Sequence, residues 1–372
     1  MRGKQGTDTL NAIDLFAGCG GLSKGLEWAN FNVVFANEIL KEPSDTYKLN
    51  HPATVHLMKD IREVTVEEIE SMIPVGKEAI HLVAGGPPCE GFSIAGKRDP
   101  DDPRSQLFLD FVRITDHFKP DWFIMENVPG LKSMKKGRVY RDIMKTFKDI
   151  GYKVESKILL AADHGVPQTR KRLFFMGTRT GKEIVFSEGN SKGKAPGKNH
   201  LTVWDAISDL PSLEAGERKV KYLKQPQNDY QRKMRENVKD GELKNHVIVK
   251  HRPRIIERFK HIPQGGNMAD APVELQPKKI YTARHRRLVA DKPSPTVTSH
   301  CLDELLHPYQ HRAVTPREAA RLQSFPDDYE ITGPLVVFHS APEHDMYEQI
   351  GDSVPPLLAK SLGSIICRKL IA

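Results

Sequence analysis

The residue of this sequence whose side chain is best suited to take part in a reaction is Cys89. It lies in the loop GGPPCEGFS (Gly85–Ser93), directly after the apolar run 79–84. Pro87 and Pro88 fix their φ angles and lack N–H donors, so the path of the chain up to the sulfur is stiff. Because open α/β sheets bind ligands at the carboxyl ends of their strands, this cysteine can act as a nucleophile. A small buried core residue is the other interpretation, since free cysteines are usually buried and inert.

Charged side chains accompany two further apolar runs. Glu126 lies at the end of the predicted strand 121–128, and Arg170 and Arg172 precede the predicted strand 173–177. A positioned carboxyl group can act as a general acid, although a helix cap or an ion-pair partner is its structural alternative. Two arginines at positions i and i+2 of a strand share one face, so both can point into the same cleft.

A turn with three glycines near the start of the chain has the residue types of a nucleotide pocket. Residues 10–16 predict a strand, residues 18–21 the turn, and residues 22–29 a helix. Glu38 ends the next strand, where a carboxylate can accept hydrogen bonds from both hydroxyls of a ribose. Asp60, at a third strand end, can accept from an adenine amino group or cap a helix. No phosphate-binding lysine follows the glycines, which excludes a P-loop.

The remaining composition excludes several classes of protein. The four cysteines are far apart and form no CxxC pair, so neither a disulfide framework nor a metal site is expected. No apolar run is long enough to predict a membrane-spanning helix. The first residues, MRGKQGTDTLNAI, contain no apolar signal-type stretch. We therefore expect a cytoplasmic protein that has no membrane association.

The elements that must position these residues alternate between strands and helices up to residue 177. This alternation predicts an α/β fold with a doubly wound, mostly parallel sheet. Beyond residue 178 the chain is rich in Gly, Lys and Ser, and its elements are short and interrupted by turns. Regular patterns return with a helix capped by Thr315 and begun by Pro316, and with an amphipathic helix over 357–370.

Net charge is +8, and its distribution is uneven. Residues 179–260 contain 19 Lys and Arg against 11 Asp and Glu, a surplus equal to that of the whole chain. Basic charge confined to one segment favours contact with a polyanion such as nucleic acid. A solvated, lysine-rich surface is the alternative.

Six motifs in this order resemble those of the C5-cytosine DNA methyltransferase family. They are DLFAGCGG (Asp14–Gly21), GGPPCEGFS (Gly85–Ser93), ENV (Glu126–Val128), QTRKR (Gln168–Arg172), REAARLQSFP (Arg317–Pro326) and GDSVPP (Gly351–Pro356). The resemblance covers residues 10–178 and 311–370, about two-thirds of the chain. It implies the methyltransferase fold, with a catalytic and cofactor-binding domain over residues 1–178, a variable target-recognition domain over residues 179–300, and a return of the chain over residues 301–372 that completes the first domain.

The resemblance also implies a reaction and its catalytic residues. The Cys89 thiolate would attack C6 of a cytosine, which makes C5 electron-rich, and Glu126 would protonate or hydrogen-bond N3. Arg172 would hydrogen-bond O2, and Arg170 would hold Glu126 in place. A methyl group would pass from S-adenosyl-L-methionine to C5, leaving S-adenosyl-L-homocysteine; the C5 proton would go to water and Cys89 would leave. Burial should raise the pKa of Glu126 so that it carries a proton near neutral pH.

The same resemblance assigns binding residues. The cofactor would contact Phe16, Ala17, Gly18, Gly20, Gly21, Glu38, Ile39, Asp60, Ile61, Pro88, Leu107, Asp352 and Ser353. DNA would contact Glu90, Ser93, Arg284, Arg286 and Arg287. Two of these depart from the usual family pattern, because Glu90 stands where Gln is more common and Asp352 where Asn is common.

The expected partner is double-stranded DNA, from which the target base must flip out to reach such a cleft. We expect a monomer associated with the nucleoid through DNA, acting alone or beside a separate restriction endonuclease. Three alternatives remain: a cytosine-C5 methyltransferase acting on tRNA, a catalytically silent DNA-binding homologue, and an oxidoreductase. The long basic middle favours DNA, the presence of both Cys89 and Glu126 disfavours the silent homologue, and the incomplete GxGxxG pattern disfavours the oxidoreductase.

Overall fold

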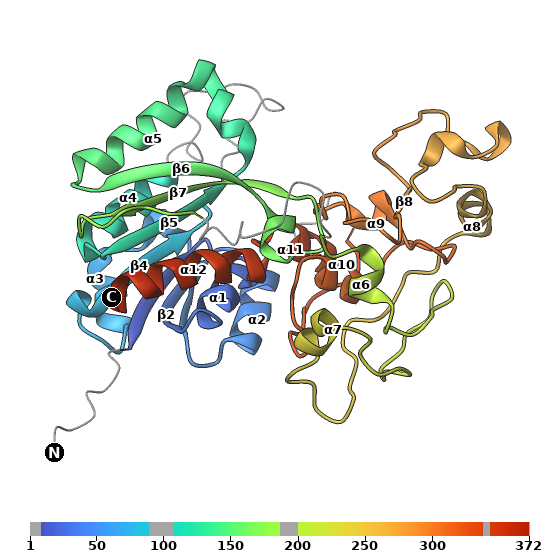
Figure 1. Cartoon of the computed structure of the whole chain (residues 1–372), viewed down its shortest axis with the longest axis horizontal. Helices are drawn as coiled ribbons and strands as arrows, with labels where there is room; N and C mark the ends of the chain where they lie inside the picture. Colours follow the sequence, from blue (N-terminus) through green and yellow to red (C-terminus); the bar gives the residue numbers. More distant parts are fainter. Residues whose placement is uncertain (1–8, 89–106, 187–199, 338–342, 372) are drawn as a thin grey trace.

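The computed structural model describes residues 9–88, 107–186, 200–337 and 343–371. Within them, seven strands form one sheet in the order β3-β2-β1-β4-β5-β7-β6 (Figure 1). The strands are β1 Leu10–Leu15, β2 Phe31–Glu38, β3 Val55–Met58, β4 Ile80–Gly85, β5 Trp122–Asn127, β6 Lys153–Leu160 and β7 Lys171–Thr178. All neighbouring pairs are parallel except the two made by β7. The predicted α/β class with a mostly parallel sheet is confirmed.

Strand β7 is antiparallel because its connection to β6 is short. Only residues 161–170 join the two strands, and η6 (Ala161–His164) is the one helical turn among them. A parallel pair needs a crossover of a dozen or more residues, usually with a full helix, whereas a short return leaves the second strand antiparallel. The carboxyl end of β5 therefore lies beside the start of β7, with Asn127 opposite Leu173.

Helices cover both faces of the sheet because neighbouring strand residues point to opposite sides. Ile13 and Phe123 pack with α3, α4 and α5, whereas Ala12 and Leu82 pack with α1 and α12. Figure 1 shows α12 beside α1, so the last helix and the first share one face. The bounds are α1 Gly21–Glu27, α2 Lys41–Asn50, α3 Val66–Met72, α4 Leu107–Phe118, α5 Arg138–Asp149 and α12 Pro356–Ile371.

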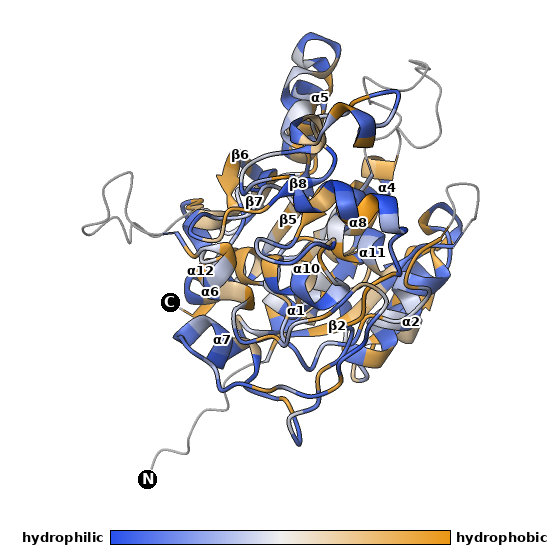
Figure 2. Ribbon diagram, turned by 90° about the vertical axis from the view of Figure 1, so that its right-hand side faces the viewer, coloured by the Kyte–Doolittle hydropathy of each residue, from blue (hydrophilic) through white to orange (hydrophobic). Residues whose placement is uncertain are grey.

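A smaller lobe, made mainly of residues 200–337, lies beside the sheet (Figure 1). Its elements are α6 Val203–Ile207, α7 Asp229–Met234, α8 Pro253–Lys260, β8 Arg286–Arg287, α9 Cys301–Glu304, β9 Leu305–Leu306 and α10 Pro316–Leu322, and α11 Met346–Asp352 follows. Thr315 caps α10 and Pro316 begins it, as predicted. Viewed from the side of this small lobe, the loops are mostly hydrophilic, and apolar residues of strands β5 and β6 lie behind them (Figure 2). No helix among the described residues is both long and apolar enough to cross a membrane.

Candidate active site and cofactor pocket

A cavity of about 500 Å³ lies at the carboxyl ends of the central strands. Strand β1 has β2 on one side and β4 on the other, so the strand order reverses at this point. Open α/β sheets bind ligands at such a reversal. Of the thirteen residues predicted to bind the cofactor, eleven line the cavity: Phe16, Ala17, Gly18, Glu38, Ile39, Asp60, Ile61, Pro88, Leu107, Asp352 and Ser353.

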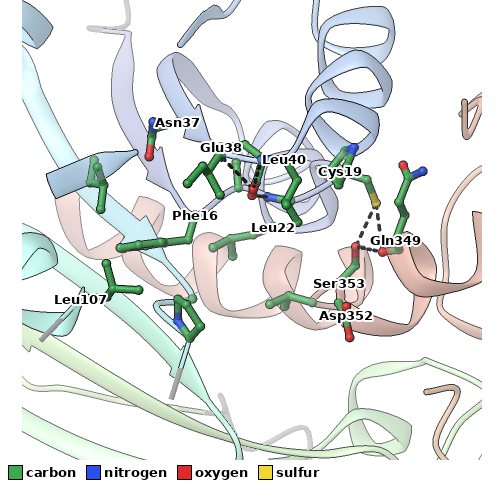
Figure 3. Close-up of a pocket in the computed structure, with 18 of the residues that line it drawn as sticks. Phe16, Cys19, Leu22, Asn37, Glu38, Leu40, Leu107, Gln349, Asp352 and Ser353 are labelled. Carbon is green, nitrogen blue, oxygen red and sulfur yellow. Dashed lines mark hydrogen bonds between the residues drawn. The ribbon is translucent and has the colours of Figure 1, made fainter. Parts of the chain in front are cut away.

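The first wall of the cavity comes from the ends of β1 and β2. Phe16 directly follows β1 with φ at 57°, a left-handed conformation that is rare for a bulky residue, and its ring extends across the cavity (Figure 3). The carboxylate of Glu38 accepts hydrogen bonds from the N–H of Gly18 (2.9 Å), Ile39 (2.8 Å) and Leu40 (2.9 Å). A carboxylate has about four acceptor positions, so one remains for a ligand hydroxyl.

Two of the predicted cofactor residues, Gly20 and Gly21, do not line the cavity. A Cβ atom at Gly20 would collide with the side chains of Tyr329 and His51, and one at Gly21 would collide with the carbonyl oxygen of Val354. Gly20 also has φ at 94°, which favours glycine. These two glycines allow the start of α1 to approach other chain segments, so their role in the fold is close packing.

Asp60 lines the cavity but already has partners on the protein. It accepts a hydrogen bond from the N–H of Arg62 (3.0 Å) at the start of η1 (Ile61–Glu63) and forms an ion pair with the Arg62 guanidinium. The capping role that the sequence left open is therefore present, and it fixes the carboxylate at the rim of the cavity.

Cys19 is a cavity residue that sequence reasoning missed, although it lies within the glycine turn. Its Sγ is 3.0 Å from Ser353 Oγ and donates to the carbonyl oxygen of Gln349 at 3.3 Å (Figure 3). Burial raises the pKa of Cys19 to about 12, so the thiol stays neutral. Further cavity residues without a sequence prediction are Leu22, Asn37, Leu40, Pro43, Arg62, Gly86, His344, Gln349 and Val354. Several flank predicted residues, but nothing in the sequence indicated Pro43 or His344.

Glu126, the predicted acid, lines the same cavity from the end of β5. Only 14% of its side chain is exposed, and its Oε1 lies 2.8 Å from Nε of Arg172. Burial raises the pKa of Glu126 above its ordinary value, while Arg172 opposes that rise. Asp352 also lines the cavity, and burial raises its pKa as well, with the charge of Arg170 acting in the opposite direction.

The predicted contact between Arg170 and Glu126 is not present; Arg172 makes it instead. The Nη1 of Arg170 donates to the carbonyl oxygen of Val297 at 2.8 Å, and its Nε and Nη2 have no partner among the described residues. The reason is local pairing, because Thr169 donates its N–H to the carbonyl oxygen of Ser294 at 2.8 Å and draws this stretch toward the small lobe. Lys171 points outward, as expected.

The loop that contains Cys89, Glu90 and Ser93 lies outside the described residues, so only its beginning can be placed. Pro88 lines the cavity. The side-chain amide of Asn127 donates to the carbonyl oxygen of Pro87 at 3.0 Å, which ties the start of the loop to the end of β5. Sequence reasoning assigned no role to Asn127, although it is the middle residue of the ENV motif.

Two buried glutamines connect four of the motifs. Gln168 donates to Gln323 Oε1 at 2.7 Å and accepts from the N–H of Val297 at 2.9 Å. Gln323 in turn donates to the carbonyl oxygens of Ile350 (2.8 Å) and Ser353 (3.2 Å). The side chain of Ser353 also contacts Cys19. These hydrogen bonds therefore connect the arginine motif to the glycine turn, and they fix the cavity wall formed by residues 352–354.

The three arginines predicted to contact DNA have different surroundings. Arg287 is only 4% exposed and donates to the carbonyl oxygens of Ile262, His307, Gln310 and Phe259, so in this structure its guanidinium serves the fold and little of it is accessible to DNA. Arg286 is half-buried and lies 3.3 Å from Glu304. Arg284 has 43% of its side chain exposed and lies 3.8 Å from Asp303, with its guanidinium over the ring of Tyr281. Of the three, Arg284 is therefore the most accessible to a partner.

Comparisons with known proteins all point to one family. The sequence model described as C-5 cytosine-specific DNA methylase matches residues 10–368. The Type II methyltransferase M.DdeI of Desulfomicrobium norvegicum is 37% identical over 96% of this chain and 88% of its own length. The Type II methyltransferase M1.HphI of Haemophilus parahaemolyticus is 35% identical over 97% of this chain and 87% of its own length.

Solved structures give the same result for the fold. A putative DNA modification methyltransferase encoded within an E. coli prophage superimposes with a TM-score of 0.76 at 27% identity, covering 98% of this chain and all of that one. The Dnmt2 methyltransferase of S. pombe, at 20% identity and a TM-score of 0.62 over 97% of this chain and 99% of that one, has the same fold. The chain therefore belongs to the C-5 cytosine-specific DNA methylase family and is a DNA (cytosine-5-)-methyltransferase.

Proposed function

We propose that the protein transfers a methyl group from S-adenosyl-L-methionine to C5 of a cytosine flipped out of double-stranded DNA, through a covalent bond between Cys89 and C6 of the base. The observation that carries this proposal is the common cavity. Glu126, held by Arg172, lines the same space as Phe16 and Glu38, so an acid for the base and a pocket for a nucleoside adjoin.

The cavity fits the adenosine and amino-acid portions of the methyl donor. Phe16 offers an aromatic face for the adenine, Glu38 keeps an acceptor position for the ribose, and Asp60 lies at the rim. Asp352 and Ser353 supply polar groups at another wall. When bound, S-adenosyl-L-methionine supplies an electrophilic methyl group.

The chain's own residues would then act in sequence. The Cys89 thiolate adds to C6 and breaks the C5–C6 double bond, while Glu126 donates a proton or hydrogen bond to N3 as negative charge develops on the ring. Arg172 holds Glu126 and hydrogen-bonds O2 of the base. After C5 is methylated, its proton passes to water, the double bond re-forms and the thiolate leaves. The raised pKa of Glu126 favours the protonated form that this role requires.

Residues 179–300 would recognise the DNA sequence. The basic surplus over 179–260 supports this role, as does the position of the small lobe beside the sheet (Figure 1). The protein would act as a monomer in the cytoplasm, as a modification methylase alone or with a separate endonuclease of a restriction–modification system.

Trapping on 5-fluorocytosine tests the covalent step. With S-adenosyl-L-methionine present, C5 is methylated but its fluorine cannot leave as a cation, so the thiolate is not expelled. The enzyme should then stay joined to a duplex oligonucleotide that bears 5-fluorocytosine at the methylated position mapped by bisulfite sequencing. The adduct should form with wild type and with the control Cys367→Ser, which alters a buried cysteine on α12, and not with Cys89→Ser. Methylation of DNA and of tRNA to the same extent, or an adduct that still forms with Cys89→Ser, would refute the proposal.

A further inference from the structure

A dense group of basic residues follows β5 and belongs to no predicted function. Between Glu126 and Asp142 the sequence contains five cationic and no acidic side chains: Lys132, Lys135, Lys136, Arg138 and Arg141. We call residues 132–141 the basic segment. It comprises most of η5 (Pro129–Gly137) and the first turn of α5, and all five cationic residues are exposed. Its charge per residue is higher than that of the long basic stretch 179–260.

Apolar residues hold the basic segment to the protein. Leu131, Met134 and Val139 are buried, at 1%, 6% and 3% exposure, and pack in the same core as Phe123. Their side chains face inward while the cationic side chains between them remain in solvent. The segment is thus a fixed surface element, and its charge is presented outward by the packing beneath it.

The backbone of the basic segment is left-handed at three successive residues. Lys135 (φ 46°, ψ 46°) and Lys136 (φ 57°, ψ 36°) are left-handed, and Gly137 follows with φ at 77°. Each left-handed residue that is not glycine costs roughly 1 kcal/mol or more, and such costs are concentrated at functional sites.

Three of the five cations, Lys132, Arg138 and Arg141, have weak or uncharged partners among the described residues. Arg138 lies 3.6 Å from Asp142, with 76% and 58% of these side chains exposed. Exposed pairs of this kind contribute little and are screened by salt. Lys132 lies over the ring of Tyr140 at 5.3 Å, and Arg141 donates to the carbonyl oxygen of Lys136 at 3.3 Å, which leaves both positive charges available to an anion.

We propose that the basic segment contacts phosphates of the DNA duplex beside the flipped cytosine, as a second electrostatic anchor on the catalytic domain. The inference rests on the proposed function. Lys132 is six residues beyond Glu126, so its Cα lies within about 20 Å of the acid, and phosphates recur about every 3.4 Å along each strand. In Figure 1, α5 begins at the end of the catalytic domain nearer the small lobe, so a duplex between the two would meet this surface.

The test compares two triple variants by the salt dependence of DNA binding. Lys132→Gln/Lys136→Gln/Arg141→Gln removes three charges of the basic segment. Lys145→Gln/Lys148→Gln/Lys153→Gln removes three exposed charges from the far end of α5 and the start of β6. The probe is a fluorescein-labelled mixed-sequence duplex with S-adenosyl-L-homocysteine present, titrated at salt concentrations from about 50 to about 200 mM.

The slope of log K against log[salt] is negative, and each lost phosphate contact should reduce its magnitude by about 0.9. The first variant should therefore show a slope less steep by about 2.7 and an affinity lower on the order of 100-fold near physiological salt. The control variant should match wild type, and both should bind S-adenosyl-L-homocysteine normally. A first variant with the slope and affinity of the control would overturn the inference alone. Wild-type protein that neither binds nor methylates DNA would overturn the proposed function and this inference together.

Discussion

Replacing Gln323 by methionine tests whether the buried glutamine chain fixes the cofactor pocket. Gln323 is fully buried, donates to the carbonyl oxygens of Ile350 and Ser353, and accepts from Gln168. Methionine has a similar length but no donor, so it leaves two buried carbonyl groups without this partner. Gln168 keeps its second acceptor, the carbonyl oxygen of Leu322 at 3.0 Å.

The expected magnitude follows from the carbonyl groups of Ile350 and Ser353. That of Ile350 keeps the N–H of Ser353 at 3.4 Å, so among the described residues the Ser353 carbonyl group alone loses its donor, and Gln323→Met should destabilise the protein by about 1–3 kcal/mol. If this cost makes it favourable by a net value of about 1.4 kcal/mol for residues 350–354 to leave the cavity wall, only about a tenth of the molecules keep a complete pocket. The apparent Kd for S-adenosyl-L-homocysteine then rises about tenfold.

Gln231→Met provides the matched control. Gln231 is also fully buried and donates to the carbonyl oxygen of Asp205 and to Ser208 Oγ, both at 2.8 Å, but it lies in the small lobe. Chemical unfolding should show comparable losses of stability, while calorimetric titration should show weaker S-adenosyl-L-homocysteine binding for Gln323→Met alone. Equal Kd values in wild type and Gln323→Met, or equal weakening in both variants, would refute the reasoning.

Three further predictions concern other regions of the molecule. Gly20→Ala should lower the melting temperature more than Gly18→Ala, because a Cβ at Gly20 meets two side chains and one at Gly18 meets nothing within 4 Å; equal losses would contradict the packing role. Burial lowers the pKa of His285 to about 4 from about 6.5, so the unfolded chain takes up this proton first and stability should fall as pH drops from about 6.5 toward 4. Replacing His285 by Gln should flatten that part of a denaturation-versus-pH curve, and an unchanged curve would count against it. Arg287→Met should destabilise the fold strongly, whereas Arg284→Ala should leave unfolding unchanged and weaken DNA binding; the reverse pattern in unfolding and binding assays would show that their roles are exchanged.

The sheet and most of the pocket could be predicted because their signals are local. Apolar runs and glycine turns give the strand ends, and parallel strands bring those ends together, so Phe16, Glu38 and Asp60 had to share one edge. The antiparallel direction of β7 depends on the short connection from β6, residues 161–170. The residue pattern of that connection did not show that the chain turns back there.

Contacts between distant segments were the least predictable. Arg170 and Arg172 have equivalent positions in the sequence, and only the pairing of Thr169 with Ser294 decides which of them reaches Glu126. Arg287 belongs to a basic run, yet it is buried and its guanidinium donates hydrogen bonds to four carbonyl oxygens. No local pattern in the sequence encodes this arrangement. His344 enters the pocket without any motif of its own.

The packing of α12 against α1 has a consequence for how the protein is made. Leu358 and Leu362 share a core with Leu22 and Leu26, so the first helix lacks its cover until the last one has been synthesised. Residues 352–354 arrive equally late in the wall of the cavity. The cavity wall and the cover of α1 therefore stay incomplete in a nascent chain until α12 has left the ribosome, so the pocket forms late in synthesis although its first wall is made early.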